Sequence, residues 1–221
     1  MRALRKPPFS LQQAWPALVP PLTALLASLL LWLNLAPAEV MHVIVEGGPV
    51  ERLTEWGYMA LAAAMWLSPP PPGERRGWLA LTVLLLAAAA REMDWHKHWT
   101  GTSVFKVSYY LHPGPLLPKL IALAILALIV LAAWHWLRQP LQAWLGPVAQ
   151  VFFAMLIISK VLDRAINLLA EDWGVHTSEG IHALVSALEE TLELSLPLIA
   201  AYGLWCYARR WRARPAALAA R

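Results

Sequence analysis

Charged residues are scarce in this chain. They make up 14% of its 221 residues, against roughly 25% in a typical soluble domain. Hydrophobic residues make up 59%, and the mean hydropathy is +0.50. Several apolar runs reach the roughly 20 residues that a helix needs to cross a bilayer. This balance excludes the water-soluble classes and predicts an all-α integral membrane protein whose main partner is the lipid bilayer.

Cysteine is almost lacking as well. Cys206 is the single cysteine, which excludes an intrachain disulfide and a cysteine-rich metal site. The net charge of +4 arises from basic residues beside apolar spans, where they orient helices and meet anionic lipid head groups. Nucleic acid is therefore not expected as a partner.

The apolar runs and the residues that interrupt them predict a single transmembrane domain, 1–221, with about six helices. The first run is too long for the core of a signal peptide, so we interpret it as an uncleaved span. Residues 69–72 are four consecutive prolines, which cannot continue a helix and so end the second span. Ser178 is the expected N-cap of the last helix. The predicted spans are 16–36, 50–68, 77–96, 116–137, 141–162 and 181–207.

The distribution of charge predicts the orientation of these spans. Basic residues gather in cytoplasmic loops of membrane proteins, and alternating the spans collects 11 of the 18 basic residues on the side of both termini. These residues are Arg2, Arg5, Lys6, Arg75, Arg76, Arg138, Arg209, Arg210, Arg212, Arg214 and Arg221. Of the 14 acidic residues, only Glu74 falls on that side. The expected location is a bacterial inner (plasma) membrane, with both termini cytoplasmic and the polar chemistry facing the periplasm.

The acidic residues and histidines of the spans fall into helical stripes. His182, Glu189 and Glu193 lie within about 40° of one another on the last span, with Glu190 at the edge. A stripe on the fifth span contains Lys160, Arg164, Asn167 and Glu171, with Asp163 alongside. Charged groups inside a bilayer are costly and usually face a bundle interior or water. We therefore expect a buried polar pocket, lined by Glu51, Arg91, Glu92, Asp94, His96, Lys160, Asp163, Arg164, His182, Glu189 and Glu193.

Three functions fit such a pocket. In the first, Arg91, Lys160 and Arg164 neutralise the carboxylates, and the chain is a structural protein or a subunit of a membrane complex. In the second, one divalent metal such as zinc polarises a water molecule to hydrolyse a lipid-like substrate. The third is transport of a small solute or of protons. The sequence does not decide whether the protein is an enzyme.

The metal hypothesis rests on spacing. Glu92 and His96 are four residues apart, which lets two side chains of one helix bind the same metal. His182 and Glu189 of the last span would complete the ligand set, and Asp94 or Glu190 would serve as the catalytic base.

Three motifs carry a resemblance to known proteins. They are Glu46-Gly-Gly-Pro-Val-Glu51, Arg91-Glu92-Met93-Asp94-Trp95-His96-Lys97 and Glu189-Glu190-x-x-Glu193-Leu194. Together they resemble a group of uncharacterised bacterial polytopic inner-membrane proteins with acidic motifs at these positions, which implies a location but no activity. The intramembrane metal hydrolases of the alkaline ceramidase superfamily are similar in gathering histidine and acidic residues at one end of a helical bundle. Their His-x-x-x-His pair in the last helix is absent from this chain.

Overall fold

The structure is a computed structural model, and the part of the chain that it describes is helical without a strand. It describes residues 11–45, 47–68, 70, 73–101, 103–104, 106–138, 146–174 and 177–219. The side chains at 11–13, 96, 166, 167, 170, 171 and 210–219 lie outside this description. The all-α class predicted from the sequence is confirmed for these residues.

The helices vary in length from single turns to more than ten turns. They are α1 (Leu11–Asn34), α2 (Pro37–Ile44), α3 (Pro49–Leu67), α4 (Arg75–Glu92), α5 (Trp95–Thr100), α6 (Val107–Leu111), α7 (Leu116–Leu137), α9 (Pro147–Glu171) and α10 (Glu179–Ala219). Their packing divides the chain into two compact units. The first unit comprises Met1–Glu51 and Leu141–Arg221, and the second comprises Arg52–Pro140.

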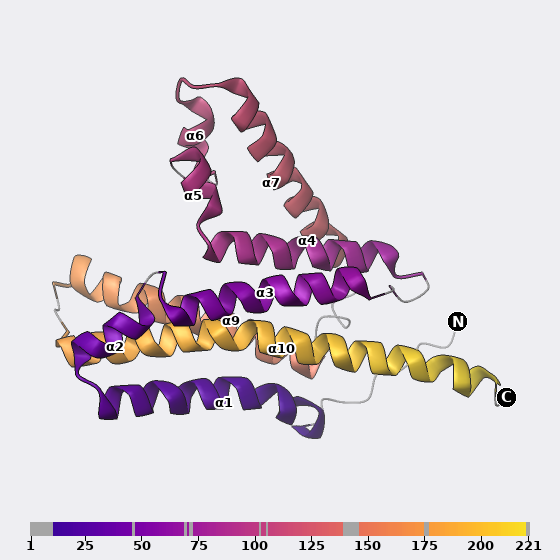
Figure 1. The fold of residues 1–221 in the computed structure, drawn as a ribbon, viewed down its shortest axis with the longest axis horizontal. Coiled ribbons are helices and arrows are strands. Elements are labelled where there is room, and N and C mark those ends of the chain that lie inside the picture. Colours follow the sequence, from indigo (N-terminus) through magenta and orange to yellow (C-terminus); the bar gives the residue numbers. More distant parts are fainter. Residues whose placement is uncertain are drawn as a thin grey trace. The chain divides into compact units, whose positions relative to one another are not determined.

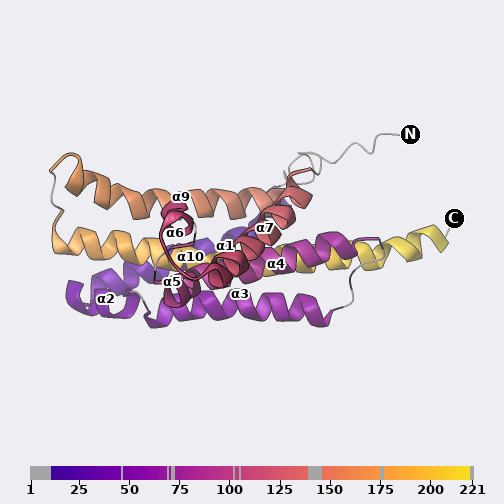
Figure 2. The same ribbon diagram turned by 90° about the horizontal axis from the view of Figure 1, so that it is seen from above.

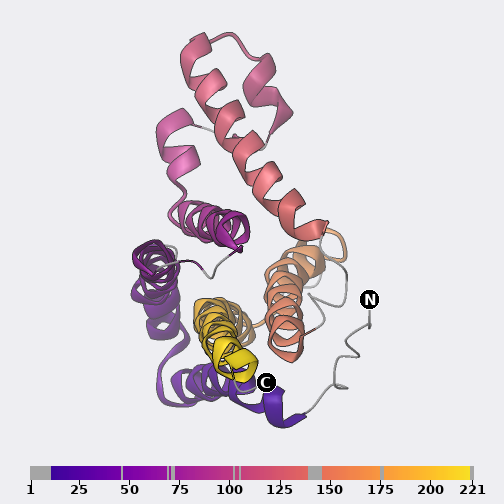
Figure 3. The same ribbon diagram turned by 90° about the vertical axis from the view of Figure 1, so that its right-hand side faces the viewer.

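In the first unit, α10 is the helix on which the others pack. It contacts α1, α2 and α9, and Figures 1 and 2 show α1 and α9 running alongside it. Ala17, Val151 and Ile199 form one buried cluster where α1, α9 and α10 meet. A second cluster joins α2 to α10 through Val40, Ile44, Ala183 and Ala187. Figure 3 shows these helices nearly end-on.

Small side chains line the contact between α1 and α10. Ala17, Ala24 and Ser28 are buried on α1, while Ala183 and Ala187 are buried on α10. Small residues let two helix backbones approach closely, which is how helices associate where no water is available to drive them together. The contact between α1 and α10 therefore relies on close backbone packing.

In the second unit, α4 packs against α7 and is joined to the end of α3 by a hydrogen bond. The indole Nε1–H of Trp78 on α4 donates to the carbonyl of Met65 near the end of α3, at 2.7 Å. A Cβ added at Gly77 would lie 3.5 Å from His135 Nε2 and 3.7 Å from Trp136 Cζ2. The last turns of α7 thus rest on the first turns of α4. The N-terminal part of α7 runs away from α4 toward α6 (Figure 1).

The helix boundaries agree with the sequence at several points. The predicted span 116–137 coincides with α7, and α3 ends at Leu67, just before the prolines at 69–72. Ser178 precedes α10, and its hydroxyl accepts from the backbone N–H of Ile181 at 3.4 Å, so the predicted N-cap is confirmed. Residues 141–145 of the fifth predicted span lie outside the described residues.

One boundary in the second unit differs from the prediction. The third span was expected to continue to 96, but α4 ends at Glu92 and α5 begins at Trp95. Asp94 between them has a φ of 46°, a left-handed backbone conformation that a right-handed helix cannot contain. Glu92 and His96 therefore do not share one continuous helix, and the prediction based on their four-residue helical spacing does not apply.

Two of the described helices are long and apolar enough to cross a membrane, judged by length and composition. They are Ala14–Asn34 and Leu116–Leu137. Most of α7 is not buried within the structure. These two helices are weak support for a membrane protein, since a buried core helix or a signal sequence can have the same length and composition.

Candidate functional site

The clearest polar contact inside the first unit joins α9 to α10. The ammonium group of Lys160 forms an ion pair with Oε1 of Glu193, and 33% and 9% of the respective side chains are exposed. Glu193 thus has its charge balanced by a cation from the neighbouring helix. Helix α9 begins with Pro147, which fits the first turn because its missing N–H has no helical partner there. Lys160 lies thirteen residues later, roughly 20 Å along the helix.

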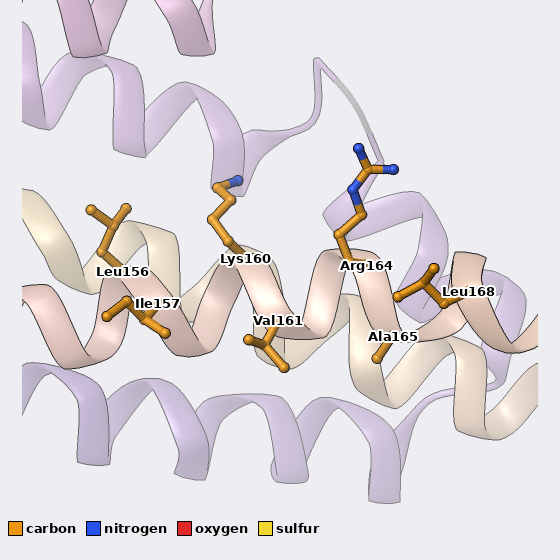
Figure 4. A pocket seen from close by; sticks show the side chains of 7 residues that line it. All are labelled: Leu156, Ile157, Lys160, Val161, Arg164, Ala165 and Leu168. Carbon is orange, nitrogen blue, oxygen red and sulfur yellow. The ribbon is translucent and has the colours of Figure 1, made fainter.

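Arg164 lies one turn beyond Lys160. Figure 4 shows both side chains projecting to the same side of α9, so this part of the predicted stripe is confirmed. Arg164 is exposed, and it forms no hydrogen bond or ion pair with any side chain that the structure describes. The side chains of Asn167 and Glu171, the other members of the stripe, lie outside the described residues.

These two cations border a shallow depression on α9, which we call the α9 groove. Its lining is otherwise aliphatic, and it consists of Leu156, Ile157, Lys160, Val161, Arg164, Ala165 and Leu168 (Figure 4). A groove of this composition can accept an apolar chain together with a negatively charged group. Among the described side chains, its lining includes no His, Asp or Glu that could serve as a metal ligand.

The acidic residues at the end of α4 pair with cations of their own segment. Arg91 Nη1 lies 3.1 Å from Oε1 of Glu92, and Lys97 Nζ lies 2.5 Å from Oδ2 of Asp94. The backbone carbonyl of Asp94 also accepts hydrogen bonds at the start of α5, from the N–H groups of Lys97 and His98 at 2.8 and 3.0 Å. These acids therefore contribute to the turn between α4 and α5.

Glu51 has a similar local role in the first unit. Its Oε2 accepts a hydrogen bond from the backbone N–H of Gly47, four residues earlier and just before α3. A carboxylate in the first turn of a helix satisfies backbone donors that have no helical partner and is favoured by the helix dipole. This contact explains Glu51 without a pocket. Glu46, the first residue of the same motif, lies outside the described residues.

The predicted metal ligands are divided between the two units. His182 is exposed and Glu189 is half-buried on α10 in the first unit, while Glu92 belongs to the second unit. The side chain of His96 lies outside the described residues. Within either unit, the described side chains form no group of three His, Cys, Asp or Glu residues that could hold a metal ion. The metal site stays a prediction, as does a catalytic role for Asp94 or for Glu190, which is half-buried on α10.

Sequence reasoning missed a polar contact between α1 and α10. The hydroxyl of Ser28, which is fully buried, donates to the carbonyl of Ala24 or Ala187, each at 3.0 Å, and lies 2.6 Å from the hydroxyl of Thr191. Two turns closer to the start of α10, Trp32 Nε1–H donates to the carbonyl of Gly180 at 2.9 Å. The sequence did contain a signal for this contact. Ser28 is the one serine of the first apolar run, and its spacing from Ala17 and Ala24 puts it on the same face of the helix.

Comparison with known proteins finds no matching family, no matching curated protein and no matching solved structure. The resemblance of the three acidic motifs to bacterial inner-membrane proteins accordingly stays an expectation. The packing and the charges of the chain are therefore the basis for inferring its function.

Proposed function

We propose that this protein is a multi-pass integral membrane protein that acts as a structural subunit of a membrane complex. In this proposal about six helices cross a bacterial inner membrane, with both termini in the cytoplasm. The observation that carries the proposal is the ion pair between Lys160 and Glu193. In this pair, a carboxylate that the sequence assigned to the pocket balances a cation of the neighbouring helix, which supports a role in helix packing.

The exposed surface of α7 supports a membrane location. Leu120, Ile121, Val130 and Leu131 are each more than half exposed, and at 100° per residue they spread over about half of the helix circumference. A helix that is hydrophobic all round is stable only in a protein core or in lipid. Since most of α7 is not covered by the rest of the chain, lipid or another membrane protein is its natural surrounding.

Aromatic and basic residues at the helix ends fit the same location. The guanidinium of Arg138 lies over the ring of Trp134 at the end of α7, 4.8 Å from its centroid. Arg209 lies over Trp205 on α10 in the same way, at 4.7 Å. Tryptophan and arginine are enriched where a span meets the head groups, and the charged partner reaches toward water. Both arginines lie on the side that we expect to be cytoplasmic.

The pairing of the carboxylates favours a structural role over catalysis. Glu193, Glu92 and Asp94 each contact a lysine or an arginine, and Glu51 satisfies a backbone N–H. A hydrolytic metal site needs carboxylates and imidazoles that converge and leave a position open for water. The described side chains instead serve helix packing and helix ends.

Cysteine labelling tests the membrane topology, because Cys206→Ser provides a cysteine-free background. In this background, Glu74→Cys and Arg138→Cys are expected to react with a membrane-impermeant maleimide only after the cells are permeabilised. His112→Cys and Asp172→Cys are expected to react in intact cells. Labelling of all four sites in intact cells, or of none after permeabilisation, contradicts a multi-pass topology.

Replacing the ion pair as a unit tests the structural role. Lys160→Met combined with Glu193→Leu removes both charges and keeps side chains of comparable size, a change that is often neutral or stabilising for a structural pair. We expect the double variant to accumulate in membranes and to migrate in native gels with the same complex as the wild type. Loss of the complex in a double variant that is still folded would show that the charges themselves act in the function.

A further inference from the structure

The α9 groove contains a cation, Arg164, that no side chain in the described part of the chain neutralises. Lys160 is paired with Glu193, whereas Arg164 is exposed and has no partner among the described side chains. Asp163 precedes Arg164 and is half-buried, with interactions of its own. The aliphatic side chains around Arg164 are exposed as well: 62% for Ile157, 60% for Val161 and 50% for Leu168. In a membrane, an anion would stabilise a guanidinium on an apolar face of this kind.

We propose that the α9 groove binds the phosphate of an anionic phospholipid, with the guanidinium of Arg164 as the principal donor. This inference rests on the membrane location proposed above. Arginine presents a planar set of donors that matches a phosphate and can form two parallel hydrogen bonds with it. The acyl chains of the lipid lie along Ile157 and Val161, on the hydrocarbon side of Arg164, which replaces exposed aliphatic surface with a contact between apolar groups.

The position of Arg164 along the helix favours a lipid head group over an acidic helix of another protein. Arg164 lies seven residues before the end of α9 at Glu171, or roughly 10 Å along the axis. The predicted span ended at 162, so Arg164 lies at the level where the hydrocarbon gives way to the head groups. Long basic side chains at this level extend toward lipid phosphates while their stems remain in the apolar region.

The test measures lipid binding to the full-length protein in a mild neutral detergent by native mass spectrometry. Phosphatidylglycerol and phosphatidylcholine are added separately to the wild type, to Arg164→Gln and to Arg209→Gln. Arg209→Gln is the matched control, because it removes the same charge from an arginine whose guanidinium covers Trp205 instead of a groove. Inorganic phosphate is included as a competitor.

We expect the wild type to bind phosphatidylglycerol more tightly than phosphatidylcholine. Arg164→Gln should weaken phosphatidylglycerol binding roughly tenfold, as expected for a lost hydrogen bond between charged groups. Arg209→Gln should bind as the wild type does, and Arg164→Lys should retain part of the preference because lysine still provides a point charge. Inorganic phosphate should not displace the lipid, since it lacks the acyl chains.

Several results would overturn the inference. These are equal binding of the two lipids, unchanged binding in Arg164→Gln, an equal loss in Arg209→Gln, or displacement by inorganic phosphate. A photoreactive residue at Val161 gives a second readout: cross-linking to lipid supports the inference, and cross-linking to a polypeptide alone contradicts it. If Arg164→Gln does not fold, the lipid preference of Arg164→Lys decides.

Failure of this inference and failure of the membrane location are distinguishable. A protein that stays in membranes during an alkaline carbonate wash but shows no lipid preference refutes the phospholipid site alone. A protein that the same wash releases from membranes refutes the membrane location, and the phospholipid site with it.

Discussion

At the scale of single residues, the ion pair between Lys160 and Glu193 is the polar contact whose loss should lower the free energy of unfolding most. Glu193→Gln leaves the ammonium of Lys160 beside α10 without its counter-charge. Breaking a buried pair costs several kcal/mol, and since Lys160 is one-third exposed we expect a loss of about 3 kcal/mol in the free energy of unfolding. Unfolding in mixed detergent, followed by circular dichroism, measures this loss.

Arg164→Gln is the control for that variant, because Arg164 lies one turn away on the same helix and has no partner among the described side chains. It should change the free energy of unfolding by less than about 0.5 kcal/mol. Equal destabilisation by the two variants would contradict a specific role for the pair. The double variant Lys160→Met/Glu193→Leu should recover most of the stability lost in Glu193→Gln.

Ser28 gives a second prediction at the residue scale. Ser28→Ala removes hydrogen bonds to Thr191 and Ala187 and should cost about 1 kcal/mol. Ser28→Leu places a larger side chain where α1 and α10 touch, and it should cost about 3 kcal/mol through overpacking. The same unfolding measurement gives both values. A Ser28→Leu variant as stable as Ser28→Ala would show that α1 and α10 are not closely packed at this point.

At the scale of elements, the turn between α4 and α5 depends on the backbone of Asp94. Its φ of 46° costs a residue with a Cβ about 1–2 kcal/mol, and it is still less favourable for a side chain that branches at Cβ. Asp94→Gly relieves this strain although it loses the ion pair with Lys97, so its stability should be close to that of the wild type. Asp94→Val should be less stable than Asp94→Gly by about 2 kcal/mol.

Thermal unfolding of the two Asp94 variants tests this prediction, and Lys97→Ala serves as a control for the lost ion pair. If Asp94→Val and Asp94→Gly have the same stability, the segment does not adopt the left-handed turn. In that case α4 would continue past Glu92, and Glu92 and His96 would regain the alignment that a metal site needs.

The sequence was sufficient where the signal lay within one segment. Residues 69–72 end α3 because proline lacks the backbone N–H and blocks the preceding turn. The largely apolar run at 116–137 predicted both ends of α7 correctly. Helix α2 was not predicted, because its eight residues form only about two helical turns, too few to show a clear periodicity of apolar residues. Its start is stabilised locally, by the backbone N–H of Ala36 donating to Glu39 at 2.9 Å.

The candidate site was only partly predictable, for a different reason. Helical periodicity predicted that Lys160 and Arg164 lie on one stripe, because such a stripe depends only on positions within a single helix. The choice of Glu193 as the partner of Lys160 depends on how α9 and α10 pack, and periodicity does not contain that information. The prediction for Glu92 and His96 assumed one continuous helix, and the backbone instead turns at Asp94; the metal site itself stays a prediction.

At the scale of the whole molecule, the structural function predicts how the protein behaves without metal. The purified protein should contain no stoichiometric zinc, iron or manganese by elemental analysis, and treatment with a chelator should leave its unfolding midpoint unchanged. A stoichiometric metal that is lost in both Glu92→Ala and His182→Ala would overturn this prediction. It would also establish the ligand set expected from the sequence.

The pairing of Lys160 with Glu193 also has a consequence for biosynthesis. A helix as apolar as α7 can leave the protein-conducting channel alone, because its one lysine, Lys119, lies in the first turn, near the head groups. Helix α9 carries Lys160 one turn inside the expected head-group level, where lipid disfavours a charge until an anion neutralises it. Its partner arrives with α10, after a connection of only seven residues, 172–178. Release of α9 should therefore wait for α10, so that the two helices enter the bilayer together as a neutral hairpin.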